Sequence, residues 1–191
     1  VYTTAVGNDA NAGTAAAPFL TITYAISQAA SGDVIFVDAG TYPEEVNVNK
    51  GLTIKGPNAG TPGFGSRVAE AIIDGQGVRA GFLIAANNII IDGFRIIQAH
   101  DPTGQKHGAI VAWVVASSNV EILNSIIQNN TVGILETYSW KIKHNLIDNN
   151  NYNSVPPVAG AGIYTDFVTN GLVIENNIFN NPQNNNPVIL A

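Results

Sequence analysis

The chain has 191 residues, of which 46% are hydrophobic and only 12% are charged, with a formal net charge of -6 at pH 7. This length allows one domain with a sizeable core, and the negative balance argues against nucleic acid and anionic membrane surfaces as partners. Cysteine is absent, which excludes disulfides and thiolate metal sites.

Residues 1–32 are predicted to form an N-terminal strand, a polar loop and a cap helix. Within 19–30, four apolar residues recur at intervals of three and four, namely Ile22, Ala25, Ile26 and Ala29. This spacing places them on one face of a helix. Thr21 is the expected N-cap, and Gly32 is expected to end the helix.

Residues 33–191 are predicted to consist of short strands and turns. Residues 33–38 read as a buried strand and 39–42 as a turn. In 46–48, valines alternate with asparagine, as expected for a half-buried strand. Residues 57–69 are rich in Gly and Pro and predict a loop.

Four later segments repeat one pattern, a strand, a polar turn and another strand: 88–96, 119–127, 139–147 and 171–179. Such repetition is typical of a solenoid, in which stacked coils together bury an apolar face that one coil cannot bury alone. Equivalent isoleucines lie 31, 20 and 32 residues apart. The pattern therefore predicts about five stacked coils, with the longer steps carrying loops.

The register predicts which side chains stack. Two rows are expected to face inward: Ile91, Ile122, Ile142 and Ile174, and then Ile96, Ile127, Ile147 and Phe179. At the intervening turn, Ser125, Asn145 and Asn177 should lie above one another and share amide hydrogen bonds. Outside, Lys141 and Lys143 should pair with Glu121 and Glu175 of neighbouring coils.

The N-terminal half carries a resemblance to a known superfamily. Residues 7–14, 18–26, 32–37, 39–42 and 52–56 resemble the opening of secreted bacterial right-handed parallel β-helix proteins of the pectin-lyase-like superfamily. The resemblance implies an all-β, right-handed parallel β-helix with one capping α-helix, forming a single domain over residues 1–191. It implies a secreted, extracellular or cell-surface location. It does not imply one activity, because the superfamily includes polysaccharide lyases, epimerases and noncatalytic surface proteins.

In the polysaccharide-active relatives, the outer face of one strand row carries the substrate groove. Here the segments 109–113, 133–137 and 162–166 align, with Val111, Leu135 and Tyr164 at outward positions. Glu136 and Asp166 are the candidate acid and base on this face. Trp113, Tyr138 and Tyr164 are candidate sugar-stacking residues. The alternative is an apolar strand face covered by a loop.

Two polar segments are further candidates. His100 and His107 flank an insert that could supply a base or hold a metal, although a polar surface loop explains it as well. Asp9 and Asn11, between glycines, suggest a Ca²⁺ site. An Asx turn accounts for the same residues.

Apolar residues also occur where the register points outward. Ile126, Leu146 and Ile178 follow the turn in three successive coils, which indicates contact with another surface or with a covering loop. Val188, Ile189 and Leu190 form an apolar strand that invites pairing with further protein.

The sequence therefore favours a secreted noncatalytic surface or matrix module that self-associates end to end or side to side. The alternatives are a lyase or epimerase acting on acidic polysaccharide, and a glycan-binding module; Ca²⁺ is a candidate cofactor, and the sequence establishes none.

Overall fold

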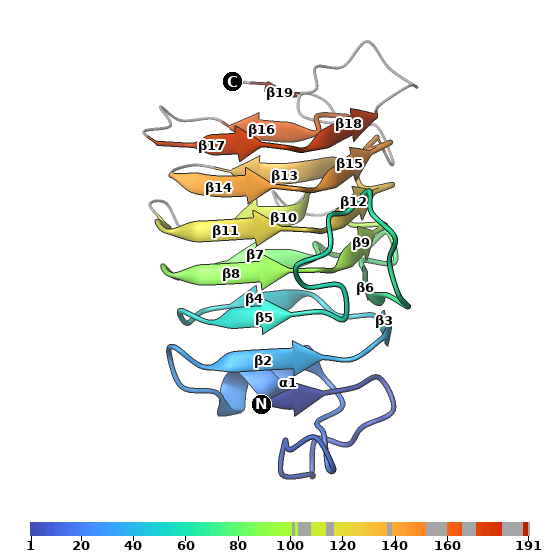
Figure 1. Ribbon diagram of the computed structural model, residues 1–191, viewed down its shortest axis with the longest axis vertical. Coiled ribbons are helices and arrows are strands. Elements are labelled where there is room, and N and C mark those ends of the chain that lie inside the picture. The colour runs from blue at the N-terminus through green and yellow to red at the C-terminus, as the bar shows by residue number, and fades with distance from the viewer. Residues whose placement is uncertain are drawn as a thin grey trace.

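The protein is a right-handed parallel β-helix, described here from a computed structural model (Figure 1). The structure describes residues 1–100, 102, 108–113, 117–136, 139–151, 160–165, 171–180 and 189–190, and for Glu136, Ile189 and Leu190 the backbone alone. The coils stack along the longest axis, with the N-terminus at one end and β19 at the other.

Three parallel sheets form the sides of the stack, and every strand pairing between coils is parallel. The first sheet contains, in spatial order, β1 (Tyr2–Thr3), β2 (Val34–Val37), β5 (Thr53–Lys55), β8 (Ile89–Asp92), β11 (Val120–Leu123), β14 (Trp140–Lys143) and β17 (Val173–Glu175). The second contains β3 (Gly40–Tyr42), β6 (Ala71–Asp74), β9 (Arg95–Ile97), β12 (Ile126–Gln128), β15 (Leu146–Asp148) and β18 (Ile178–Asn180). The third contains β4 (Val46–Val48), β7 (Phe82–Ile84), β10 (Gly108–Ala112), β13 (Val132–Glu136), β16 (Ile163–Thr165) and β19 (Ile189–Leu190).

Coils 1 to 6 are numbered here from β2, since each contributes one strand to each sheet within the described residues. The sequence predicted about five coils and a turn at residues 39–42. In the structure Gly40–Tyr42 is the strand β3, and Asp38 and Ala39 alone make the corner. The buried Tyr42 hydroxyl donates to the Asp38 carbonyl oxygen across this corner, 2.8 Å away.

The predicted inward rows are confirmed. In the first sheet, Ile122 is in register with Ile91 and Ile142, and Ile142 with Ile174. In the second sheet, Ile127, Ile147 and Phe179 follow one another in the same way. Because side chains alternate between the faces of a strand, each row places its members in one continuous core. Most members of these rows are less than 2% exposed.

Two buried amide ladders fill the corners on either side of the second sheet. Asn145 Nδ2 donates to Asn177 Oδ1 at 3.0 Å, and the Ser125 backbone N–H donates to Asn145 Oδ1 at 2.9 Å. In the second ladder, Asn130 Nδ2 donates to Asn150 Oδ1 at 2.9 Å. These amides satisfy backbone groups that a sharp corner leaves without partners.

The left-handed backbone of this corner falls one residue before the stacked side chain. Asn124, His144 and Asn176 have φ between 51° and 58°, and each precedes the stacked residue. The stacked amide thus faces inward while its neighbour bends the chain. Short polar side chains tolerate this conformation better than branched ones.

The helix α1 (Ile22–Gln28) covers the N-terminal end of the stack and buries Ile22, Ala25 and Ile26 beneath coil 1 (Figure 1). Thr21 is its N-cap, as predicted, and its hydroxyl accepts from the Tyr24 N–H. The helix ends earlier than predicted, with Ala29 as its C-cap, and Gly32 belongs to the following turn. None of the helices in the described residues is long and apolar enough to cross a membrane.

Candidate functional site

The outer face of the third sheet is the first candidate site, and the register predicted for it is confirmed. Val111 pairs with Leu135, and Leu135 pairs with Tyr164. The same outward row continues to Leu83 and Asn47 in the lower coils. The row therefore runs along the stack over at least five coils.

The middle of this outward row is buried from solvent. Leu83 and Val111 are each only 2% exposed, although they point away from the main core. With Ala80 they form a small second cluster, against which Leu135 packs. A substrate groove needs an accessible floor, and coils 2 and 3 do not provide one along this row.

The structure places the backbone of one candidate carboxylate, Glu136, off the outward row. Glu136 pairs with Thr165, whose side chain is 5% exposed, so its backbone position belongs to the inward-facing register. The side chain of Glu136, together with Asp166 and Tyr138, lies outside the described residues. Their roles stay predictions.

The two remaining aromatic candidates lie in different coils. Trp113 follows β10 in coil 3, is 47% exposed, and donates its backbone N–H to the Ile84 carbonyl oxygen at 2.9 Å. Tyr164 lies in coil 5 and is half-buried. The two do not share a coil or a row, so the geometry does not bring them to one sugar-binding platform.

His100 is buried at a corner and does not overhang the third sheet. It is 5% exposed, its Nδ1 lies 2.9 Å from Thr131 Oγ1 one coil away, and its backbone N–H donates to the Arg79 carbonyl oxygen. The insert that it begins continues through His107, which lies outside the described residues. In the structure, His100 therefore acts first as a link between coils 3 and 4.

The candidate Ca²⁺ loop is held by internal hydrogen bonds. Asp9 Oδ1 accepts from the N–H groups of Leu20 and Thr21, and Asp9 Oδ2 accepts from the Thr21 hydroxyl, at 2.8, 3.0 and 2.9 Å. Asn11 Nδ2 donates to the Pro18 carbonyl oxygen at 2.8 Å. The described residues contain no group of three or more His, Cys, Asp or Glu side chains that could hold a metal.

The outward residues of the second sheet form a second candidate surface. Ile72, Ile126, Leu146 and Ile178, here named the apolar column, follow one another in coils 2, 4, 5 and 6, with Arg95 in coil 3. Ile178 is 44% exposed, whereas the others are half-buried. Val188 lies outside the described residues, and Ile189 and Leu190 pair with Ile163 and Tyr164 as β19.

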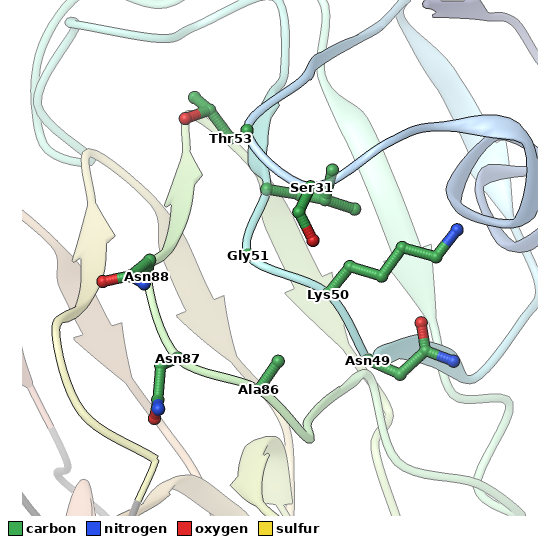
Figure 2. Close-up of a pocket in the computed structure, with 10 residues that line it drawn as sticks. Ser31, Asn49, Lys50, Gly51, Thr53, Ala86, Asn87 and Asn88 are labelled. Atoms are coloured by element: carbon green, nitrogen blue, oxygen red, sulfur yellow. The ribbon is translucent and has the colours of Figure 1, made fainter.

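A hollow of about 430 Å³ lies at the corner between the third and first sheets, beside the exit of α1 (Figure 2). It is lined mainly by neutral groups, including Ser31, Asn49, Asn87 and Asn88. The Lys50 ammonium points away from it and donates to three carbonyl oxygens at the end of α1. The hollow thus offers hydroxyls and amides without a free charge.

Several charged side chains outside the core form ion pairs or hydrogen bonds to the backbone. Lys141 pairs with Glu121 at 2.6 Å and Lys143 with Glu175 at 2.9 Å, both as predicted. Glu44 accepts from the N–H groups of Ile22 and Thr23 at the start of α1. These carboxylates thus link neighbouring coils and the start of the cap helix.

A sequence model of the family described as "Protein of unknown function (DUF1565)" matches residues 5–190. The chain belongs to this family. It is a pectin-lyase-like β-helix family, which agrees with the resemblance seen in the N-terminal segments. No curated protein matches the chain.

A solved structure titled "Rhamnogalacturonan lyase" is similar, with a TM-score of 0.44 and 17% sequence identity. The match covers 100% of this chain and 59% of that one, so the chain spans little more than half of its length.

Sequence reasoning placed Val111 on the third sheet's outer row but missed Leu83, which is buried beside it. The run Phe82–Ile84 is apolar on both faces, which is the signal of a strand buried on both sides. It also missed Arg67 and Glu70, whose ion pair depends on how a long loop folds back. No local pattern indicates that contact.

Proposed function

We propose that this chain is a noncatalytic structural module, a secreted or cell-surface β-helix that associates with further copies of itself. The burial of Leu83 and Val111 carries the proposal, because it closes the face on which polysaccharide-active relatives would hold substrate. A glycan chain requires an open, continuous trough, and this row is interrupted by a buried apolar stretch at Leu83 and Val111.

The pairing of carboxylates with basic side chains supports the same proposal. Acid and base catalysis needs titratable groups that are free to exchange protons with a substrate. In the described residues, Glu70, Glu121 and Glu175 are paired with Arg67, Lys141 and Lys143. Their geometry fits a role in holding loops and coils together.

The apolar column supports self-association. Ile178 is 44% exposed in line with Leu146 and Ile126, and an aligned apolar strip on a rigid sheet favours side-by-side contact. The low content of charged residues and the abundance of Asn, Gly and Thr suit an extracellular location.

The experiment is a search for cleavage. The chain is incubated with pectate and with alginate, with and without Ca²⁺, and unsaturated uronate is followed by ultraviolet absorbance. We expect no product, and no difference between wild type, Glu136→Ala and Asp166→Ala. Product formation that either substitution abolishes would establish the lyase alternative instead.

Glycan binding is a second candidate, favoured by the 47% exposure of Trp113. The chain has two tryptophans, and Trp140 is fully buried, so a fluorescence change on adding a glycan would report on Trp113. A saturable change lost in Trp113→Ala would support this function. An unchanged spectrum would exclude binding at Trp113.

A further inference from the structure

The connection from β5 to β6 leaves its own coil and crosses its neighbours. Residues 57–70, here named the strap, rise from β5 past β9 and β12 and return to β6 (Figure 1). The Gly60 N–H donates to Asp92 Oδ1 in coil 3 at 3.1 Å, and the Gly63 N–H donates to the His144 carbonyl oxygen in coil 5 at 2.8 Å. The strap therefore spans coils 2 to 5.

The strap lies directly on the backbone beside Ile126 and Leu146 of the apolar column. A Cβ atom at Gly63 would be 2.3 Å from the Ser125 carbonyl oxygen and 2.6 Å from the Leu146 nitrogen. Ile126 and Leu146, next to this contact, are half-buried. Ile178, one coil beyond the last strap contact, is 44% exposed. The strap thus lies against the backbone beside the apolar column in coils 4 and 5, and makes no such contact with coil 6 within the described residues.

Polar anchors hold the strap in place. The Arg67 side chain is 7% exposed, donates to the carbonyl oxygens of Asn124 and Thr61 at 2.8 Å, and pairs with Glu70. By contrast, the strap's large apolar residues face solvent, with Phe64 43% and Val68 64% exposed. A segment fixed at a few polar points, without a buried apolar face of its own, can open locally.

The closed arrangement also leaves one group unsatisfied. Arg95 stands in line with the apolar column, between Ile72 and Ile126, and its Nε is shut off from solvent without a hydrogen-bond acceptor. A buried donor without an acceptor disfavours the state that buries it. An arrangement that brings an acceptor to Arg95 would relieve this cost.

We propose that the strap is a removable cover, and that its release lets a second copy of the chain dock on the apolar column. This inference rests on the proposed self-association and adds its regulation. It makes the closed strap an autoinhibitory contact, so that the apparent affinity between copies is reduced by the fraction of molecules whose strap is closed.

The charges of the same face favour a second copy as the occupant. The Asp148 side chain, in coil 5, has no hydrogen-bond or ion-pair partner among the described residues, and the Arg95 side chain, in coil 3, has none either. They lie on the outer face of one sheet, on either side of coil 4. A two-fold axis through coil 4 would place each Arg95 near the partner's Asp148, so the face is complementary to itself.

The first test lifts the strap with a single methyl group. Gly63→Ala would force the strap off Ser125 and Leu146, whereas a Cβ at Gly65, the matched control, approaches only strap atoms, the nearest 3.2 Å away. Sedimentation velocity over a concentration series measures association. We expect Gly63→Ala to lower the dimer dissociation constant by about tenfold, and Gly65→Ala to behave as wild type.

A second pair of variants keeps the test independent of any folding defect in the first. Arg67→Met should release the strap and promote dimers in the same way, and Leu146→Asp added to either opened variant should return it to monomer. Hydrogen exchange of residues 57–70 establishes that the strap has opened. If opened variants associate no better than a self-associating wild type, the cover is refuted and the proposed function stands. If neither wild type nor opened variants associate, both are refuted.

Discussion

Asn145 donates its side-chain N–H to Oδ1 of Asn177, 3.0 Å away and 32 residues later in the chain. The same Asn145 amide also donates to the Ile122 carbonyl oxygen, and its own Oδ1 accepts from the Ser125 N–H. One buried side chain therefore joins three successive coils. Stacking at this corner is as much a polar interaction as an apolar one, because each amide replaces the water that would otherwise satisfy the corner's backbone.

We predict that Asn145→Ala lowers the free energy of unfolding by about 2–4 kcal/mol, because it leaves buried backbone groups unpaired and opens a cavity. Asn145 is fully buried. Urea denaturation followed by circular dichroism measures the change. The control is Asn129→Gly, at an exposed corner with φ of 56°, which should change stability by less than about 0.5 kcal/mol. Equal effects of the two substitutions would contradict the ladder's role.

Two arginines near the strap should respond oppositely to replacement by methionine. Arg67→Met breaks a nearly buried ion pair and two backbone contacts, so we expect a loss of about 2–4 kcal/mol. Arg95→Met removes a buried donor that has no acceptor while keeping the apolar stem, so it should be neutral or stabilising. Thermal and urea denaturation of both variants provide the measurement. A large loss in Arg95→Met would mean that its guanidinium has a stabilising partner.

We expect the buried Tyr42 phenol to make the folded protein less stable in alkaline solution. Burial, and then the negative charge of Asp38, raise the pKa of its phenol above the ordinary value. The unfolded chain then loses this proton near pH 10 while the folded chain retains it, so stability falls as the pH rises above about 10. Tyr42→Phe should flatten this fall, and at neutral pH should cost about 0.5–1.5 kcal/mol for the lost hydrogen bond to Asp38. Identical alkaline profiles for the two proteins would contradict the assignment.

The inward rows could be predicted from the sequence, because apolar residues recur at equivalent positions in several coils. The isoleucines of the first sheet and the Lys141–Glu121 pair follow from register alone. The backbone conformation at the corners was harder to predict from the sequence. His144 adopts a φ of 58° at the same corner position as Asn124 and Asn176, a position that the sequence pattern did not assign to the left-handed backbone. Contacts such as Gly63 against Leu146 join residues far apart in sequence, and a loop's composition does not indicate its path.

The end of α1 shows the same limit on a smaller scale. Gly32 is the obvious stop signal, yet the helix ends at Gln28, where Lys50 donates to the carbonyl oxygens of Ile26, Ser27 and Ala29. A cation at a helix C-terminus satisfies these acceptors. That residue comes from the corner after β4, so a local reading of the helix could not find it.

Thiol accessibility along the third sheet tests the central claim most directly, because the chain has no cysteine of its own. Val111→Cys and Trp113→Cys place single thiols two residues apart, at positions that are 2% and 47% exposed. The account predicts that a maleimide labels Trp113→Cys rapidly and Val111→Cys only after denaturation. Equally rapid labelling of both in the folded protein would show an open trough and would contradict the noncatalytic module proposed for this chain.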